Sequence, residues 1–335
     1  MKRALILLLT ALMVVTCFTA CKKGDINKST SAGNGELNQA GVIKIGGMKG
    51  ATTIGMLKVM NDSNNDTAKG NYNFRIETDA AAINPLLIKG DLDMAALPAN
   101  AAATLYNKTN GAIEVLAINT LGLLYILETG NTIESVSDLK GKTICATGKG
   151  TTPEFALRYI LSKNGIDPDN DVSFDWKSEA SEVLAALKKG VASVAMLPQP
   201  FATVAQSKVD SLNVALDLNE EWNKTGTESM LVTGVLVARK EFVENNPELV
   251  KQFLEEYKAS IEYVNNNASE ASVWINETIG VEAAAAEAAI PYCNLSYIDG
   301  SDMKSALKGY LDELYSQDPN SVGGKVPTDD FYYEG

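Results

Sequence analysis

The order of apolar and polar residues divides the chain into three parts. Residues 4–15 are almost all apolar and follow the two positive charges of Lys2 and Arg3. Residues 22–41 are rich in Ser, Thr, Asn and Gly, and such a segment buries too little surface to offset its ordering entropy. From residue 42 onwards, short β-rich runs alternate with segments of helical periodicity. This alternation predicts an α/β fold with parallel sheets.

Two stretches of the alternating region resemble each other at an offset of 100 residues. The matching positions include a glycine that ends a helix, an alanine in the next apolar run and a Leu-Pro pair at its end. The pairs are Gly90 with Gly190, Ala95 with Ala195, Leu97-Pro98 with Leu197-Pro198, and Lys49-Gly50-Ala51-Thr52 with Lys149-Gly150-Thr151-Thr152. Two separate matches at one offset indicate a duplicated structural unit.

Each copy predicts a strand, a glycine-containing loop and a helix. The strands are expected at residues 42–45 and 142–145. In the second copy Thr151 and Glu154 have capping-box spacing, and Pro153 fits the first helical turn. A stop at residues 164–165, a strand at 172–176, a helix at 179–189 and a strand at 193–196 should follow.

The duplicated loops are the candidate ligand site. Residues 49–53 and 149–152 lie between a strand and a helix, where unpaired N–H groups and the helix dipole favour an anionic or strongly hydrogen-bonding ligand. The alternative is that these threonines only cap their helices and that both lysines are solvated. Aromatic groups of the site could stack a flat ligand. The predicted ligand-binding residues are Lys49, Thr52, Thr53, Asn100, Thr120, Tyr125, Lys149, Thr151, Thr152, Gln199 and Phe201.

The first 21 residues have the order of a secretory signal: positive charge, apolar core, then small residues. The core is shorter than the roughly 20 residues that span a bilayer. The ending Thr19-Ala20-Cys21 resembles a bacterial lipobox, although Phe18 replaces the usual leucine. We therefore expect a signal peptide at 1–20, lipidation of Cys21 and a flexible tether at 21–41, with a cleaved soluble protein as the alternative.

Composition narrows the chemistry that is available. The chain has no histidine, which excludes Ser-His-Asp catalysis and His-ligated zinc, and no metal or cofactor is expected. Cys145 and Cys293 are the cysteines that remain beyond the signal, and two buried free thiols are favoured over a disulfide. A formal net charge of −13 disfavours nucleic acid as a partner.

Several segments resemble one family of transport proteins. They are Gly90-Asp91-Leu92-Asp93-Met94-Ala95-Ala96-Leu97-Pro98, Asp138-Leu139-Lys140-Gly141-Lys142-Thr143-Ile144, Ala195-Met196-Leu197-Pro198-Gln199-Pro200 and Asn246-Pro247-Glu248-Leu249-Val250. Over residues 42–316 the chain resembles the nitrate, sulfonate, taurine and thiamine-pyrimidine group of ABC-transporter substrate-binding lipoproteins.

That resemblance implies a type II periplasmic-binding-protein fold, with two Rossmann-like lobes joined by two crossover strands and a ligand cleft between them. Lobe 1 would comprise residues 42–125 and 235–335, and lobe 2 residues 126–234. The apolar runs 124–127 and 234–238 would be the crossings, and residues 247–265 a helix of lobe 1. The tail at 329–333 is expected to be a surface strap.

The resemblance also implies a function. The chain would be an extracytoplasmic, monomeric, membrane-anchored protein that closes around a small anionic or flat heterocyclic solute and delivers it to an ABC-transporter permease. Two alternatives stay open. One is an enzyme on the same fold, similar to a menaquinone-pathway lyase, and the other is a surface lipoprotein that acts as an adhesin or receptor.

Overall fold

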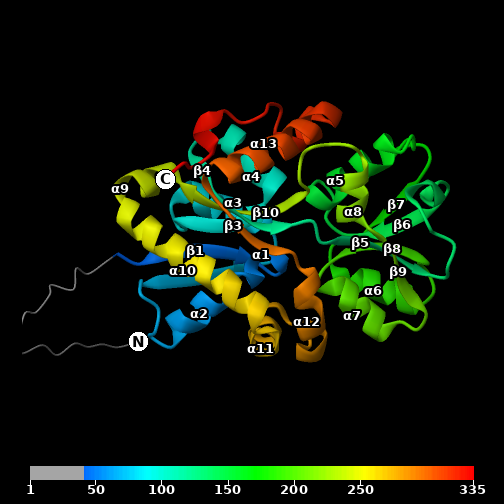
Figure 1. Cartoon of the computed structure of the whole chain (residues 1–335), viewed down its shortest axis with the longest axis horizontal. Helices are drawn as coiled ribbons and strands as arrows, with labels where there is room; N and C mark the ends of the chain where they lie inside the picture. The colour runs from blue at the N-terminus through cyan, green and yellow to red at the C-terminus, as the bar shows by residue number, and fades with distance from the viewer. Residues whose placement is uncertain (1–40) are drawn as a thin grey trace, which may run out of the picture. The chain divides into compact units, whose positions relative to one another are not determined.

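The structure is a computed structural model that describes residues 41–335. The predicted signal peptide, Cys21 and nearly all of the predicted tether lie outside the described residues. Residues 40–335 form one unit, whose strands are arranged in two sheets covered by helices (Figure 1). Among residues 41–335, no helix combines the length and apolar character needed to cross a bilayer.

The first sheet has six strands in the order β11-β4-β10-β3-β1-β2. Its strands are β1 (Ile43–Met48), β2 (Tyr72–Glu77), β3 (Met94–Pro98), β4 (Ile113–Leu121), β10 (Val232–Arg239) and β11 (Leu295–Ile298). β1 pairs in parallel with β2 and β3, whereas β10 runs antiparallel to β3 and β4.

The second sheet has five strands in the order β7-β6-β8-β5-β9. Its strands are β5 (Leu124–Thr129), β6 (Thr143–Ala146), β7 (Ser173–Trp176), β8 (Val194–Pro198) and β9 (Leu212–Asp217). β6 pairs in parallel with β7 and β8, and β5 runs antiparallel to β8 and β9.

The two sheets have the same strand topology, and each sheet contains one strand, β10 or β5, that follows the other sheet's strands in the chain. The order β2-β1-β3-β10-β4 of the first sheet corresponds to β7-β6-β8-β5-β9 of the second. β5 follows β4 in the chain yet lies in the second sheet, and β10 follows β9 yet lies in the first. Leu97 pairs with Val235, and its counterpart Leu197 pairs with Tyr125. The offset of 100 residues is therefore a duplicated fold unit, as predicted.

Helices cover both sheets. They are α1 (Ala51–Ile54), α2 (Leu57–Asn64), α3 (Ala80–Lys89), α4 (Ala99–Lys108), α5 (Thr152–Lys163), α6 (Ala180–Lys188), α7 (Phe201–Lys208), α8 (Leu218–Lys224), α9 (Lys240–Asn245), α10 (Pro247–Asn266), α11 (Ala268–Ile279), α12 (Ala283–Ala289) and α13 (Gly300–Gln317), with 3-10 turns η1 (Val136–Leu139), η2 (Ile290–Tyr292), η3 (Pro319–Val322) and η4 (Asp329–Phe331). The predicted α/β class is confirmed. The predicted lobe boundaries stay predictions.

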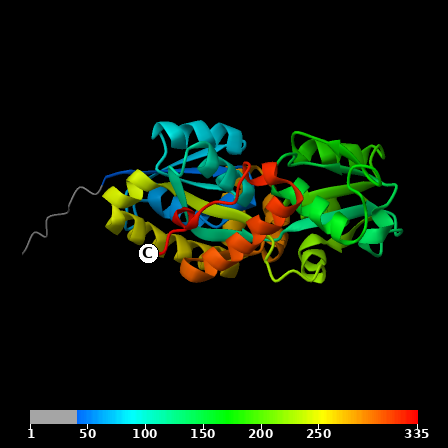
Figure 2. The ribbon, with the colours of Figure 1, turned by 90° about the horizontal axis from the view of Figure 1, so that it is seen from above.

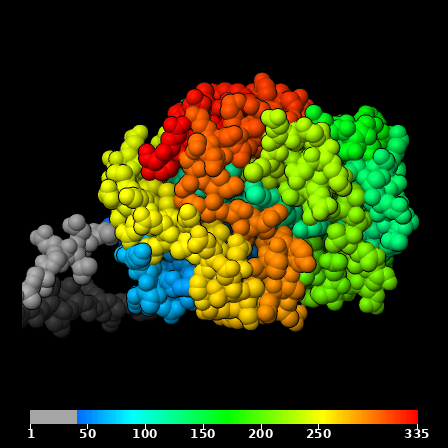
Figure 3. All heavy atoms as spheres, viewed as in Figure 1, coloured from blue at the N-terminus to red at the C-terminus, as the bar shows by residue number. Residues whose placement is uncertain are grey.

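Two helices from the end of the chain reach the second sheet. α13 packs against α4, β4 and β10 of the first sheet and also against α5. α12 packs against α7, and the space-filling view shows α12, in orange, beside the green segment that contains α7 (Figure 3). The C-terminal part of the chain therefore contacts helices of both sheets.

The tail after α13 differs from the predicted surface strap. Figure 2 shows this segment, in red, crossing the helices of the first sheet. Its aromatic residues Phe331 and Tyr332 are buried, and Phe331 packs on Tyr106 with ring centroids 4.9 Å apart. Aromatic side chains bury a large apolar surface, so this segment joins the core with Phe331 and Tyr332 as it crosses the helices.

Asp330 of this tail makes the stability of the fold depend on pH in the acidic range. Lys240, Thr328 and Tyr106 all donate to its carboxylate, and these contacts hold its pKa below the usual range. A group with a lowered folded-state pKa stabilises the fold above its unfolded pKa of about 3.9, and that contribution is lost as the pH falls. The side chain is 59% exposed, so we expect Asp330→Asn to lower stability at pH 7 by less than about 1 kcal/mol.

Urea unfolding at pH 7 and pH 3 measures this effect. The difference in the free energy of unfolding between wild type and Asp330→Asn should be smaller at pH 3 than at pH 7. Asp329→Asn is the matched control, because Asp329 is 82% exposed and lies 3.6 Å from Lys304. A difference for Asp330→Asn that is equal at both pH values would contradict the prediction.

Candidate functional site

The candidate site lies at the carboxyl ends of the strands that the repeat relates. β1 leads through residues 49–50 into α1, and β6 leads through residues 147–151 into α5. β3 ends at Pro98, directly before α4, and β8 ends at Pro198, shortly before α7. In open α/β sheets these ends are where ligands bind.

Lys49 and Lys149 are both exposed in their loops. Neither forms an ion pair with another residue between 41 and 335. Their ammonium groups are thus free of internal partners. The arrangement is compatible with contact to an anion and equally with solvation.

Two of the predicted threonines use their hydroxyl groups within their own loops. Thr53 Oγ1 donates to the Met48 carbonyl oxygen at 2.6 Å and accepts from the Met48 N–H at 2.8 Å. Thr151 Oγ1 donates to the Gly148 carbonyl oxygen at 2.7 Å. These two hydroxyls shape the loops and do not cap the helices, which differs from the alternative interpretation of the threonines.

The start of α5 differs from the predicted capping box. Thr151 is the N-cap residue, but its side chain makes no capping hydrogen bond. Glu154 instead accepts from the Gly150 N–H at 2.7 Å and from Arg158 Nε at 2.9 Å. The Thr151 hydroxyl turns back to Gly148, so the carboxylate satisfies the N–H group one residue earlier than predicted.

Thr52 and Thr120 meet through a residue that the sequence prediction missed. Asn119 of β4 donates from Nδ2 to the Thr52 carbonyl oxygen at 3.4 Å and accepts from Thr120 Oγ1 at 2.9 Å. All three residues are at most 5% exposed, and Thr52 Oγ1 is buried without a hydrogen-bond partner. The available signal was an asparagine inside an apolar β-run, since a buried amide needs partners.

Asn100 connects the two sheets. It lies in the first turn of α4 and is 2% exposed. Its Nδ2 donates to the carbonyl oxygens of Gly150 at 3.4 Å and Ser321 at 3.2 Å, and its Oδ1 accepts from Thr152 Oγ1 at 3.3 Å. The structure therefore brings the predicted residues Asn100 and Thr152 together, from the carboxyl ends of β3 and β6.

The remaining predicted residues lie on β5 (Tyr125) and at the start of α7 (Gln199 and Phe201). Tyr125 OH donates to the Tyr292 carbonyl oxygen at 3.5 Å. Gln199 Oε1 accepts from the hydroxyl of Thr203 at 2.9 Å and from its N–H at 3.3 Å, within the first turn of α7. Phe201 is half-buried and packs between the apolar clusters of the two sheets. Ligand contact by these three residues stays a prediction.

Most of the buried polar groups near the strand ends are uncharged hydroxyls and carboxamides: Thr52, Thr53, Asn100, Asn119, Thr120, Thr152, Gln199 and Ser321. The buried carboxylate beside them is Glu154, which pairs with Arg158 at 2.9 Å. Burial raises the pKa of Tyr125 and of Tyr257 further above its ordinary range, so both phenols are uncharged. This part of the molecule can hydrogen-bond a small polar molecule, and the two exposed lysines can add positive charge.

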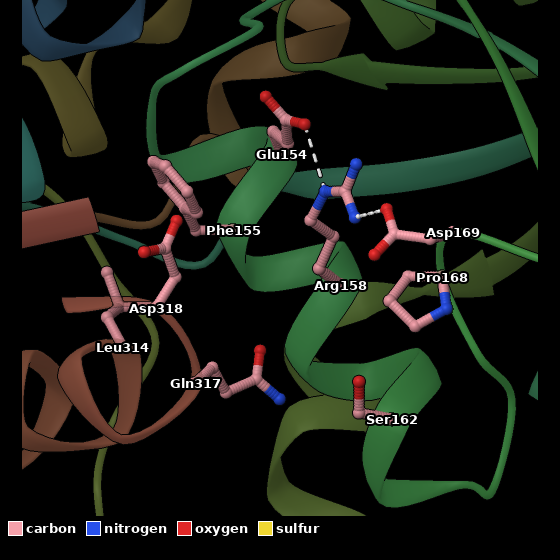
Figure 4. A pocket seen from close by; sticks show the side chains of 9 residues that line it. All are labelled: Glu154, Phe155, Arg158, Ser162, Pro168, Asp169, Leu314, Gln317 and Asp318. Atoms are coloured by element: carbon pink, nitrogen blue, oxygen red, sulfur yellow. Dashed lines mark hydrogen bonds and ion pairs between the residues drawn. The ribbon is translucent and has the colours of Figure 1, made fainter. Parts of the chain in front are cut away.

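A cavity of about 620 Å³ lies beside this region, between α5 and α13 (Figure 4). Arg158 stands at its centre and donates to Glu154 and, at 2.7 Å, to Asp169. Leu314, Gln317 and Asp318 of α13 and its end line the opposite side. Glu154 and Asp169 neutralise the guanidinium and Asp318 adds a further negative charge to the lining, so the cavity disfavours anions, and it contains none of the predicted ligand-binding residues.

Metal and thiol chemistry add little to the site. Within residues 41–335, no group of three or more Cys, Asp and Glu side chains is placed to hold a metal ion. Cys145 and Cys293 are buried free thiols, as predicted, and burial raises the pKa of Cys293 to about 12. A thiol with so high a pKa is a poor nucleophile at physiological pH.

Comparison with known proteins assigns the family and the fold. Residues 77–271, more than half of the chain, match the NMT1/THI5-like protein family. A protein of Brucella abortus that is described as a binding protein is 29% identical over 150 residues. That match covers 45% of this chain and 44% of the relative, so the chain spans less than half the length of the curated relatives that it matches.

Two crystal structures have the same fold. A chain described as an ABC transporter from Parabacteroides distasonis is 24% identical with a TM-score of 0.72, over 88% of this chain and 99% of that one. The periplasmic aliphatic sulphonate-binding protein SsuA of Escherichia coli is 14% identical with a TM-score of 0.71, over 87% and 92%. The resemblance predicted from the sequence is confirmed: the chain belongs to the NMT1/THI5-like family and has the type II periplasmic-binding-protein fold.

Proposed function

We propose that this chain is an extracytoplasmic solute-binding protein that captures a small molecule and presents it to the permease of an ABC importer. The observation that carries the proposal is the duplicated unit, which places equivalent strand-to-helix loops on two sheets. Asn100 donates to Gly150 and accepts from Thr152, and these hydrogen bonds join the carboxyl ends of β3 and β6, one from each sheet. A molecule bound there would touch both halves.

The proposed mechanism is closure of two lobes around the solute. A ligand that bridges both lobes binds the closed form better and shifts the open–closed population. Moving that equilibrium from 1:99 to 99:1 requires a differential affinity of about 5.5 kcal/mol. Hydrogen bonds to charged groups contribute roughly 1.5–3 kcal/mol each, so three or four suffice. The permease would then recognise the closed shape.

The family and the relatives support this function over the alternatives. The E. coli neighbour binds aliphatic sulphonates, and the Brucella relative is described as a binding protein. The proposed export signal argues against the lyase-like enzyme. We further propose that the signal peptide directs export and that lipidated Cys21 then anchors a monomer to the bacterial membrane, outside the cytoplasm.

The solute is proposed to be small and either anionic or a flat heterocycle. Uncharged hydroxyls and carboxamides form most of the buried part of the site, and the buried Glu154 carboxylate is paired with Arg158. An anion would also need Lys49 or Lys149, whereas a heterocycle could use the carboxamides together with Tyr125 or Phe201. The two solute classes therefore depend on different residues of this chain.

A thermal-shift screen over sulfonates, inorganic oxyanions, pyrimidines, flavins and amino acids tests the function. A bound solute at 100 times its Kd should stabilise the protein by about 2.7 kcal/mol. Conversion of a bound compound into a new product would support the enzyme alternative. A panel that produces no shift, together with binding to a surface protein, would support the adhesin alternative.

The double substitution Lys49→Met/Lys149→Met separates the solute classes. If the solute is an anion, the substitution should weaken binding at least tenfold, because two positive charges are removed from loops at the site. If the solute is a neutral heterocycle, the Kd should change less than twofold. Isothermal titration with the compound found in the screen measures both cases.

The repeat offers a matched control for the lysines. Lys89 and Lys189 are a second equivalent pair, exposed at the ends of α3 and α6. Lys89→Met/Lys189→Met changes the net charge equally but leaves the candidate loops intact. Equal weakening of anion binding by both double variants would assign the effect to net charge alone and remove Lys49 and Lys149 from the site.

A further inference from the structure

Asn100 is held by three segments that are far apart in the sequence. It belongs to α4, which packs on the first sheet. Gly150 and Thr152 belong to the loop before α5, next to the second sheet, and Ser321 belongs to η3 in the C-terminal segment. One carboxamide therefore bridges the first sheet, the second sheet and the end of the chain.

The contacts of Asn100 require an amide in one orientation. Both of its Nδ2 hydrogens point at carbonyl oxygens, which can only accept, while Oδ1 accepts from the Thr152 hydroxyl. A carboxylate of the same shape would place an oxygen against two carbonyl oxygens. The geometry thus distinguishes asparagine from aspartate without any change in size.

The partner loop is fixed on its other side. The Gly150 N–H donates to Glu154 at 2.7 Å, and Glu154 in turn accepts from Arg158 of the same helix. Residue Gly150 is therefore held on both sides: its N–H donates to Glu154 of α5, and its carbonyl oxygen accepts from Asn100. A displacement of α5 relative to α4 must break the bonds to Asn100.

The bonds from Asn100 to the second sheet are long, at 3.3 and 3.4 Å. Hydrogen bonds from nitrogen to oxygen are usually 2.7–3.2 Å and those from a hydroxyl to oxygen 2.5–3.0 Å, so these two are individually weak. Weak bonds between the two halves suit a contact that must break and re-form. They contrast with Asn107 on the same helix, whose Nδ2 donates at 2.7 and 2.6 Å to the carbonyl oxygens of Val322 and Lys325.

We propose that Asn100 is a latch that sets the open–closed equilibrium before any solute is bound. Its carboxamide holds the loop at 150–152 against α4, and the closed population of the solute-free protein depends on these bonds. This inference rests on the proposed closure mechanism and adds a named regulator to it. Because apparent affinity scales with the binding-competent fraction, the latch also tunes the solute Kd.

The test compares Asn100→Asp with Asn107→Asp in solute-free protein. Nitroxide labels on Ile88→Cys and Val191→Cys report the separation of the halves, because both positions are exposed, one on α3 and one just after α6. Cys17 and Cys21 are replaced by serine in every variant, and Cys145 and Cys293 are buried. Pulsed electron spin resonance gives the distance distribution.

We expect Asn100→Asp to move most of the distribution to longer distances, and Thr152→Val to move a smaller part, because it removes one of the two bonds to the second sheet. Asn107→Asp should keep the wild-type distribution, because the Asn107 amide donates to the C-terminal segment and not to the loop at 150–152. Folded Asn100→Asp with the wild-type distribution would overturn the proposal. If Asn100→Asp does not fold, an unchanged distribution in Thr152→Val overturns it.

The measurement separates the latch from the solute-binding function because it uses no solute. A shifted distribution in a protein that binds nothing in the screen would support the latch and reject the proposed function. Solute binding together with an unchanged distance distribution in Asn100→Asp would support the proposed function and reject the latch. Where both hold, the Kd of Asn100→Asp should rise by about 5–10-fold, in proportion to the lost closed fraction.

Discussion

Trp222→Ala should lower the free energy of unfolding by about 3–5 kcal/mol, within the range for removal of a large buried aromatic side chain. Trp222 of α8 is fully buried. Its ring stacks on Tyr159 of α5 at 4.3 Å and lies 5.5 Å from Tyr310 of α13. Its Nε1 donates to the Ser229 carbonyl oxygen at 2.9 Å. The indole therefore ties three helices together, and its removal leaves a cavity among them.

Urea unfolding followed by circular dichroism measures this loss. Trp176→Ala is the matched control, because Trp176 is half-buried and stacks on one ring, Phe174, at 5.2 Å. We expect the control to lose about 1–2 kcal/mol. The loss of unfolding free energy for Trp222→Phe should lie between those of Trp222→Ala and Trp176→Ala, because phenylalanine keeps a ring but leaves the Ser229 carbonyl oxygen unpaired. A loss for Trp222→Ala no larger than for Trp176→Ala would contradict the prediction.

Gly234→Ala should damage both stability and solute binding. Gly234 of β10 lies against Asn119 and Thr52, and an added Cβ would stand 2.6 Å from Thr52 Cγ2, in contact with Asn119 Oδ1 and 3.3 Å from Thr120 Cβ. Overpacking of this kind typically costs about 1–3 kcal/mol. Because Thr52 and Asn119 must move, we expect solute affinity to fall more than tenfold.

Gly50→Ala tests whether the effect is specific to crowding. Gly50 precedes Thr52 in the same loop, has an extended backbone with φ 179°, and an added Cβ would meet nothing within 4 Å. It should leave affinity and stability near the wild-type values. Titration of the solute and urea unfolding give the two readouts. Wild-type affinity in Gly234→Ala would show that the Thr52 region takes no part in binding.

The internal repeat explains why so much of the fold was predictable. The glycines at 90 and 190 end equivalent helices, and the Leu-Pro pairs end β3 and β8. These signals are local, because they depend on backbone conformation and on the missing N–H of proline. The predicted strands at 124–127 and 234–238 and the helix at 247–265 are also confirmed, since their apolar patterns match a buried strand and an amphipathic helix.

The roles of individual polar side chains were less predictable. Thr52, Thr53, Thr151 and Thr152 look alike in sequence, yet two bond within their own loops, one reaches Asn100, and one has an unpaired hydroxyl. A hydroxyl rotates to whichever partner the packing supplies. Asn119 escaped notice because its partners, Thr52 and Thr120, are assembled by the sheet and not by the local sequence.

The sequence by itself determined the alternation of strands and helices, the duplicated unit, the positions of the two candidate loops and the family, because each depends on short-range patterns of apolar residues, glycine and proline. The tertiary structure alone decided that Phe331 is buried and that Asn100 bridges α4 to the loop before α5. These features join residues separated by 50 to more than 200 positions. Their partners are chosen by packing and by the need to satisfy buried polar groups, which no local pattern records.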